Sequence, residues 1–237
     1  MKRIVVLSGS GISAESGLQT FRDTGGLWEG YSIEDVATPE GFGRNPERVL
    51  AFYNDIRKRV LAADPNPAHK ALVELETAFE VHIITQNVDD LHERAGSQNV
   101  LHLHGEIRKA RSVASADCIV PYEQDIQLGD LAPDGSQLRP HVVWFGEMVP
   151  MMYTAAEIVE TADLVIIVGT SLAVYPASSL VELAPTSAPI YVVDPHRPSF
   201  HMSSIQEDRL NFITEKASTG IPKLVLHLIS TRDGLSD

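Results

Sequence analysis

The sequence predicts an α/β fold, a Rossmann-like, doubly wound parallel sheet that carries a small inserted domain. Three observations lead to this prediction. Apolar runs with strand character alternate along the chain with segments of helical periodicity. Two of the runs, within residues 4–7 and 163–171, are continuously apolar, which is typical of strands buried on both faces. The first run passes directly into a glycine turn, as the first strand of a nucleotide-binding sheet does.

The alternation gives an expected order of elements over residues 1–237, which we interpret as one domain. Residues 13–16 should begin a helix after the first turn. Glycines, turn formers and aromatic residues fill residues 23–43, a composition typical of a mobile loop that could close over a nucleotide. Further helices are expected over 46–62, 68–80, 91–97, 154–162 and 176–184, and further strands over 81–86, 99–107, 141–147, 163–171 and 189–195.

Two segments are expected to depart from the main sheet. Residues 23–67 combine the glycine-rich loop with helical periodicity and should form a cofactor loop and helical insert. Residues 108–140 are polar and have little apolar periodicity. We expect them to form a reduced small domain.

The composition excludes several classes of protein. With 32 acidic and 19 basic residues the net charge is −13, so no nucleic-acid-binding surface is expected. The apolar run at 4–7 is too short for a membrane span or the core of a signal peptide. The single cysteine, Cys118, allows no disulfide within the chain and favours a cytoplasmic location. We expect a monomer that binds neither nucleic acid nor membrane.

The turn after the first strand is the expected nucleotide site. Gly9 and Gly11 permit a tight turn and a close approach of the backbone to a bound group, and the start of a helix presents amides to a pyrophosphate. The spacing fits G-x-G-x-x-G with Ala14 at the third position, a weak match on its own. The alternative is a turn whose glycines serve only the geometry of the backbone.

Polar residues follow other strands at the edge of the sheet where ligands bind in this class of fold. Asn87 and Asp89 follow the strand at 81–86, where they could orient a ribose, a water or a carboxamide, or simply cap the next helix. Asp194 ends a later strand and could accept hydrogen bonds from ribose hydroxyls.

His104 is the candidate general base. It precedes a glycine at a predicted strand end, so its ring should be accessible, and imidazole titrates near neutral pH. With nine histidines in the chain, a structural role is more frequent for any one of them. We expect His92 and His102 to be structural.

Eight segments resemble the motifs of one family, the sirtuins, which are NAD-dependent protein deacylases. They are GSGISAESGLQTFRDTGGLW (9–28), ATPEGF (37–42), FYN (52–54), TQNVDDLHERAG (85–96), LHLHGE (101–106), LRPHVVWFGE (138–147), GTSLAVYPA (169–177) and EKAS (215–218). The resemblance covers almost the whole chain and is greatest to the bacterial branch that removes small acyl groups. Ser10 stands where the family usually has alanine.

The resemblance implies a protein-lysine deacetylase, with desuccinylase or demalonylase activity as an extension, that consumes NAD and releases nicotinamide and O-acyl-ADP-ribose. It assigns His104 as the base for a ribose hydroxyl and makes Asn87 the second catalytic residue. The cofactor residues that it implies are Gly9, Ser10, Gly11, Glu15, Phe21, Arg22, Trp28, Gln86, Asn87, Asp89, Gly169, Thr170, Ser171, Asp194 and Ala217. On the side of the acyl-lysine protein it implies Val143, Phe145 and Gly146 for the peptide backbone and Ala37, Tyr53 and Arg57 for the acyl group.

Two departures from the family affect the details. Most sirtuins bind a structural zinc through four cysteines, whereas this chain has only Cys118, so we expect no zinc. Sirtuins that remove acidic acyl groups carry an arginine three positions after a helical tyrosine, but here Tyr53 is followed by Ile56 and then Arg57. Ala37 matches the small residue that widens the pocket in that branch. Arg57 should either replace the missing guanidinium in part or point to solvent.

Three other functions remain as alternatives. An NAD glycohydrolase or ADP-ribosyltransferase could use the same scaffold, although His104 and the strand at 141–147 favour deacylation. A nucleotide-sensing module without catalysis should lack His104 or Asn87, and both are present. A redox dehydrogenase fits worst, because its helix does not continue from the glycine turn as this one does.

Overall fold

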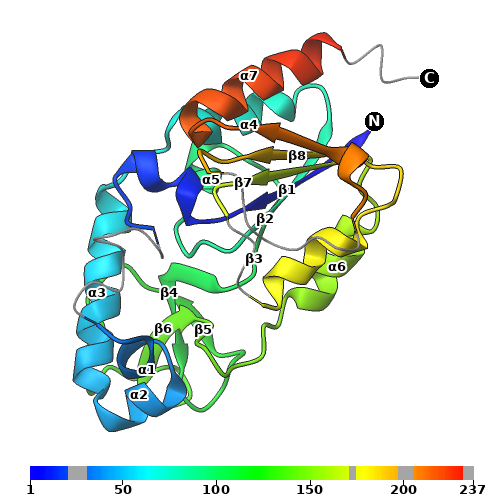
Figure 1. The fold of residues 1–237 in the computed structure, drawn as a ribbon. Coiled ribbons are helices and arrows are strands. Elements are labelled where there is room, and N and C mark those ends of the chain that lie inside the picture. The colour runs from blue at the N-terminus through cyan, green and yellow to red at the C-terminus, as the bar shows by residue number, and fades with distance from the viewer. Residues whose placement is uncertain (21–30, 171–174, 197–204, 232–237) are drawn as a thin grey trace.

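The computed structural model describes residues 1–20, 31–170, 175–196 and 205–231. The chain forms two lobes, an upper one around a six-stranded sheet and a lower one around a three-stranded sheet (Figure 1). No helix in these four ranges is long and apolar enough to cross a membrane.

The six-stranded sheet is parallel throughout and has the order β3-β2-β1-β7-β8-β9. Its strands are β1 (Arg3–Ser8), β2 (Glu80–Thr85), β3 (Val100–His102), β7 (Leu164–Val168), β8 (Ile190–Val193) and β9 (Leu210–Ile213). The order reverses between β1 and β7, which makes a crevice at the carboxyl ends of these two strands.

Helices cover both faces of this sheet. The helices α4 (Pro67–Leu75) and α7 (Ala217–Ser230) pack on one face, where Ile4 and Val6 of β1 point. On the other face, α6 (Met152–Val159) and the 3-10 helix η3 (Ala177–Leu183) pack over Val5 and Leu7. Because alternate side chains of β1 enter two separate cores, its four central residues, 4–7, are all apolar. The predicted doubly wound parallel sheet is confirmed.

The lower lobe combines segments that lie far apart in the sequence. Its helices are α1 (Ile33–Val36), α2 (Pro39–Arg44) and α3 (Pro46–Ala62), and its antiparallel strands are β4 (Gly105–Ser112), β5 (Ile119–Pro121) and β6 (Leu138–Val142). The side chains of Ser32, Thr38 and Asn45 accept backbone N–H bonds at the starts of the three helices. One face of α3 packs on Ile107, Val142 and Trp144 in a core that belongs to this lobe.

The segment at 99–107, expected to be a single strand, belongs to two different sheets. The strand β3 ends at His102, and β4 begins at Gly105 in the lower lobe. Gly105 has φ of +82°, and a Cβ at this position would lie 2.2 Å from the carbonyl oxygen of His141. Only glycine fits this turn, which therefore places His104 between the lobes.

Other predicted elements also differ from the structure. The expected helix start at 13–16 is a pair of 3-10 turns, η1 (Ser10–Ile12) and η2 (Ala14–Ser16). The strand expected at 141–147 ends at Val142, because the Glu147 carboxylate accepts the N–H of Trp144 at 2.8 Å and closes a turn. The described part of the expected loop at 23–43 contains α1 and α2. The remaining elements are α5 (Leu91–Ala95) and η4 (Glu207–Arg209).

Replacing Gly105 by alanine should lower the free energy of unfolding by at least about 3 kcal/mol, because the new Cβ adds a backbone clash to a left-handed conformation. Gly129 is the matched control. It has φ of +96° but nothing within 4 Å of an added Cβ, so Gly129→Ala should cost only about 1–2 kcal/mol. Urea unfolding measures both, and equal losses would contradict a special role for the turn at Gly105.

Candidate active site

A cavity of about 700 Å³ lies between the two lobes, at the carboxyl edge of the large sheet. It brings together sixteen of the residues predicted from the sequence. They are Gly9, Ser10, Gly11, Glu15, Ala37, Tyr53, Gln86, Asn87, His104, Val143, Phe145, Gly146, Gly169, Thr170, Asp194 and Ala217. Four others, Phe21, Arg22, Trp28 and Ser171, fall outside the described residues.

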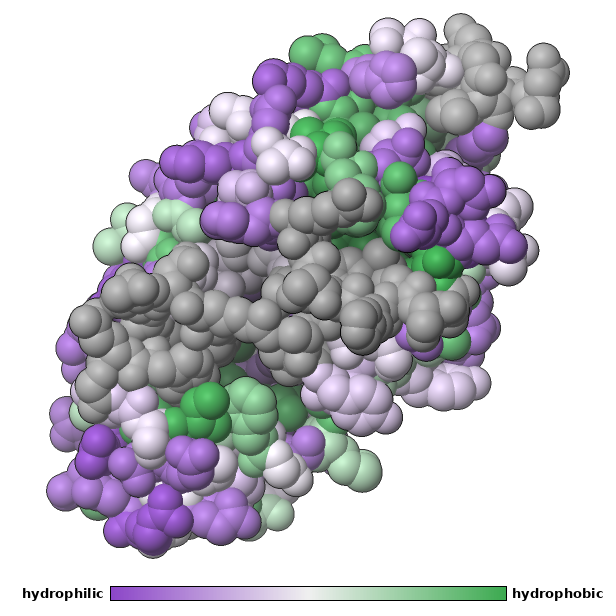
Figure 2. Space-filling view, in the orientation of Figure 1, coloured by the Kyte–Doolittle hydropathy of each residue, from purple (hydrophilic) through white to green (hydrophobic). Residues whose placement is uncertain are grey.

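The surface of the molecule differs between the ends and the middle of this face. Hydrophilic residues cover the outer end of the lower lobe, the upper lobe shows both kinds, and hydrophobic residues of the lower lobe lie toward the middle of the view (Figure 2). Phe145 lines the cavity and is exposed to 46%. The lower-lobe side of the cavity therefore offers apolar contacts to a ligand.

The glycine turn packs against the protein's own backbone. The N–H groups of Gly9 and Gly11 donate to the carbonyls of Val168 and Gly169, at 3.1 and 2.9 Å. A Cβ at Gly11 would lie 2.7 Å from Cα of Gly169. The glycines are thus required for the contact between the turn and the end of β7, a reason that the sequence did not reveal.

The amides of this turn are largely used within the protein. The N–H groups of Ile12 and Ser13 donate to Gly9 and Ser10, so the expectation that the first amides after the strand face a pyrophosphate is wrong. The next two amides, of Ala14 and Glu15, have no acceptor within the part of the chain that the structure describes. Both residues line the cavity, so an anion could reach η2 rather than η1.

A buried polar chain links the turns after β1 and β2. Asn87 Nδ2 donates to the carbonyl of Gly9 and to Ser13 Oγ, both at 3.2 Å, and Ser13 Oγ donates to Asp89 Oδ2 at 3.0 Å. Asp89 also accepts the N–H of Leu91, so it does cap α5. Burial raises the pKa of Asp89 to about 6. Asp89 lines a neighbouring cavity of about 50 Å³, not the large one.

Asn87 keeps one unused acceptor. Its Oδ1 is buried and has no hydrogen-bond partner among the described residues. Buried polar atoms in native structures nearly always have a partner. An unpaired amide oxygen beside a large cavity therefore fits a donor on a bound ligand.

The environment of His104 fixes both its tautomer and its charge. Nδ1 lies 3.0 Å from the carbonyl oxygen of Gln86, which can only accept, so Nδ1 carries the proton. Nε2 then has a lone pair, and no partner is present for it among the described residues. Burial lowers the pKa of His104 below 6.5 and outweighs the hydrogen bond to Gln86. The ring is therefore a neutral base at pH 7.

Three predicted residues join neighbouring elements around the cavity. Gln86 Nε2 donates to Thr170 Oγ1 at 3.1 Å and links the ends of β2 and β7. Glu15 Oε2 accepts the N–H of Ser218 at 3.0 Å, so the carboxylate lies at the positive end of α7. These contacts hold the cavity wall together before any ligand binds.

Arg57 is turned away from the cavity, contrary to both expectations for it. It is 1% exposed, and Nε donates to the carbonyl of Ile107 at 2.9 Å. Its Nη1 donates to Asn54 Oδ1 at 2.8 Å and to the carbonyl of Gln124 at 3.2 Å. Arg57 therefore joins α3 to the rest of the lower lobe and does not reach the pocket beside Tyr53.

The segment after β6 rests on an ion pair that the sequence reasoning missed. Glu147 accepts hydrogen bonds from Arg139 at 2.6 Å, from Arg111 at 2.9 Å and from the N–H of Trp144. The Arg139 guanidinium lies 3.2 Å from the centre of the Trp144 ring. Arg139 and Glu147 lie near the two ends of the segment LRPHVVWFGE (138–147). The presence of both in one family-like motif is the sequence feature that could have indicated the pair.

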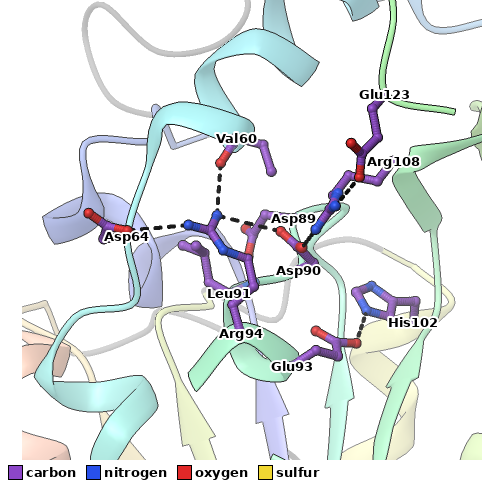
Figure 3. A network of polar contacts seen from close by, with 10 residues as sticks. All are labelled: Val60, Asp64, Asp89, Asp90, Leu91, Glu93, Arg94, His102, Arg108 and Glu123. Carbon is purple, nitrogen blue, oxygen red and sulfur yellow. Dashed lines mark hydrogen bonds and ion pairs between the residues drawn. The ribbon is translucent and has the colours of Figure 1, made fainter. Parts of the chain in front are cut away.

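A second set of charges bridges the two lobes beside the turn between β2 and α5 (Figure 3). Arg108 of β4 contacts both Asp90, which precedes α5, and Glu123. Arg94 of α5 donates to the carbonyl of Val60 at 3.2 Å. These pairs join residues far apart in the sequence, so no local pattern predicted them.

The chain matches the Sir2 family model over residues 9–176. An NAD-dependent protein deacylase of Helicobacter pylori is 55% identical over 202 residues, which cover 85% of this chain and 88% of that protein. One of the same name from Bacteroides thetaiotaomicron is 48% identical over 237 residues, 97% of this chain and 99% of the relative. A solved complex of a Sir2 homologue with NAD has a TM-score of 0.85 at 40% identity, covering 99% of this chain and 91% of its own. This chain therefore belongs to the Sir2, or sirtuin, family.

Proposed function

We propose that this chain is an NAD-dependent protein deacylase that removes acyl groups from lysine side chains. One observation carries the proposal: the turn after β1, the unpaired oxygen of Asn87 and the neutral ring of His104 meet at one cavity. The deacylase relatives and the homologous complex with NAD support it.

The cavity residues fit a dinucleotide. A volume of about 700 Å³ lies within the range of ordinary ligand sites. The hydroxyls of Ser10 and Thr170 suit phosphate oxygens, and the carboxylate of Asp194 suits ribose hydroxyls. Asn87 Oδ1 suits the amide protons of a carboxamide. When bound, NAD supplies an electrophilic ribose carbon whose bond to nicotinamide breaks.

His104 accepts the proton of a ribose hydroxyl at Nε2. The Gln86 carbonyl holds Nδ1, so the base is presented to the cavity in a single tautomer. Because the pKa of His104 is lowered below 6.5, the ring is neutral above that pH and is protonated as the pH falls through its own pKa. Turnover should therefore be lost on the acid side only below pH 6.5.

The peptide of the substrate lies along residues 143–146. The N–H groups of Val143 and Phe145 already donate to the carbonyls of His104 and Ala37, both at 2.9 Å, and that of Trp144 donates to Glu147. A substrate strand can therefore pair here mainly by donating its own N–H groups to carbonyls. Such backbone pairing tolerates many side chains.

The acyl group enters a neutral pocket. Its wall includes Ala37, Phe52, Tyr53 and Ile56, and burial raises the pKa of Tyr53 well above its usual value, so the hydroxyl stays uncharged. Among the described residues that line the cavity no arginine occurs. An acyl carboxylate beside Tyr53 would be desolvated without a guanidinium to pair with it, which is costly. We therefore propose a preference for neutral acyl groups, and withdraw Arg57 as a partner of acidic ones.

Replacing His104 by alanine should lower kcat for an acetyl-lysine peptide by about 10²- to 10⁴-fold, the usual contribution of a general base. The control is His227→Ala, on the exposed side of α7, which should leave turnover unchanged. The assay is release of nicotinamide with and without peptide. Release that needs no acyl peptide would contradict the proposal and favour an NAD glycohydrolase or ADP-ribosyltransferase.

For the acyl preference, kcat/KM for an acetyl-lysine peptide should exceed that for the succinyl-lysine peptide by about tenfold or more, the effect of an unpaired buried charge. Ile56→Arg, three residues after Tyr53, should narrow this ratio. Arg57→Met should leave the acetyl-to-succinyl ratio of kcat/KM unchanged, because Arg57 contacts only the lower lobe. The ratio is measured on the folded fraction of this variant. A ratio that shifts in Arg57→Met would restore the discarded role.

The family's structural zinc does not fit this chain. The one cysteine, Cys118, cannot supply four thiolates, and no group of three or more potential metal ligands occurs in the described ranges. Asn54 of α3 instead makes a pair of hydrogen bonds, both 2.9 Å, with the backbone of Ile126. We propose that packing and these bonds hold the lower lobe together without metal.

Removal of metal by EDTA should therefore leave the melting temperature unchanged within about 1 °C, a shift that corresponds to a small fraction of a kcal/mol. Elemental analysis of the purified protein accompanies the measurement. One zinc per chain, together with a fall in melting temperature when it is removed, would contradict the proposal.

A further inference from the structure

Four successive carbonyls, from Thr85 at the end of β2 to Val88, accept hydrogen bonds from residues 102–107, which run from the end of β3 into β4. The four pairs, from donor to acceptor, are Leu103 N–H to Thr85 at 2.9 Å, His104 Nδ1 to Gln86 at 3.0 Å, His102 Nδ1 to Asn87 at 2.9 Å and Ile107 N–H to Val88 at 2.8 Å. Two of the four donors are imidazole rings. The position of the Asn87 peptide thus depends on a second histidine besides the catalytic one.

His102 differs from His104 in the number of acceptors that face it. Its Nδ1 faces the Asn87 carbonyl, and its Nε2 lies 2.7 Å from Oε1 of Glu93 (Figure 3). A carbonyl and a carboxylate only accept, so both contacts are satisfied only when both ring nitrogens carry protons. The His102 side chain is 7% exposed and that of Glu93 is 40% exposed, so the ring is shielded from water while the carboxylate reaches the surface. His102 is therefore held as an imidazolium.

The surrounding charges agree with this assignment. Burial lowers the pKa of His102, but the hydrogen bond and charge of Glu93 outweigh it, with help from the Asn87 carbonyl and Glu106, and the net shift is upward from 6.5. Asp89 and His92 also face the ring from the turn and α5, and burial keeps His92 neutral by lowering its pKa. Lys109 of β4 acts on Glu93.

We propose that His102 is a positioning residue: clamped as a cation between Glu93 and the Asn87 carbonyl, it holds the segment 86–87 that orients His104 and Asn87 in the cavity. The inference rests on the proposed deacylase function. It also predicts that turnover requires a protonated His102, and therefore falls as the pH rises through the pKa of that ring. A neutral ring has only one N–H, so a lone pair then faces either the carbonyl or the carboxylate, and one of the two contacts becomes repulsive.

The two sides of the pH profile then belong to different histidines. Turnover falls at acid pH when His104 gains a proton and falls at alkaline pH when His102 loses one. Because Glu93 raises the pKa of His102, Glu93→Gln should move only the alkaline limb, by about one pH unit toward acid. The acid limb should stay in place, since Glu93 does not contact His104.

The test compares variants that separate the two contacts. His102→Ala loses both and should reduce kcat about 10- to 100-fold, the effect of a small misplacement of reacting groups, with KM for the peptide within about twofold. His102→Asn retains an amide donor of similar reach for the Asn87 carbonyl and should recover much of the loss at pH 7. His82→Ala is the matched control, because His82 also pairs with a glutamate, Glu80, but at the opposite end of β2.

Two further readouts distinguish positioning from folding. NMR titration of the unliganded protein should give a pKa above 6.5 for His102 and a lower value in Glu93→Gln, and melting temperatures should show that His102→Asn is folded. The inference is overturned if the alkaline limb of Glu93→Gln coincides with that of the wild type, or if His102→Ala keeps the wild-type kcat. If the wild type itself does not act on acyl peptides, the proposed function fails, whatever the NMR titration shows.

Discussion

Contact of backbone with backbone, possible only at glycine, is the constraint on which the rest of the structure depends. Gly11 lies against Gly169, so the turn after β1 contacts the end of β7. This contact borders the crevice that forms where the strand order reverses. Gly105 lies against His141 and turns the chain from the large sheet into the small one. Together these contacts place the cavity between the lobes and His104 at its wall.

Two nearby histidines, His104 and His102, lie in opposite environments because of this arrangement of the backbone. His104 has one acceptor and a partly buried ring, so it is neutral and can take a proton, whereas His102 has two acceptors and is held charged. On the lower-lobe side, the two buried arginines near the cavity are already bonded: Arg139 pairs with Glu147, and Arg57 is bonded within the lower lobe. The part of the cavity beside Tyr53 is left neutral, which is why we assign it to neutral acyl groups.

The sequence predicted whatever depends on local pattern. Continuous apolar runs identified the buried strands, and the pair His104-Gly105, through its resemblance to the family motif, indicated the base that we propose. The sequence did not predict features in which a residue's partner lies on a distant part of the chain. Periodicity over 99–107 cannot reveal that β3 and β4 belong to different sheets, and spacing on a helix cannot decide whether Arg57 faces a pocket or the carbonyl of Ile107. The role proposed for His102 depends on Glu93, which is only nine residues earlier but belongs to a different element, α5.

The account as a whole requires that NAD and an acyl-lysine peptide meet beside His104. A crystal structure of the protein with a non-hydrolysable NAD analogue and an acetyl-lysine peptide tests this most directly. We predict a ribose hydroxyl within hydrogen-bond distance of His104 Nε2, a ligand donor on Asn87 Oδ1 and the acetyl group against Ile56. A dinucleotide bound away from His104, or an Asn87 oxygen still without a partner, would contradict the account.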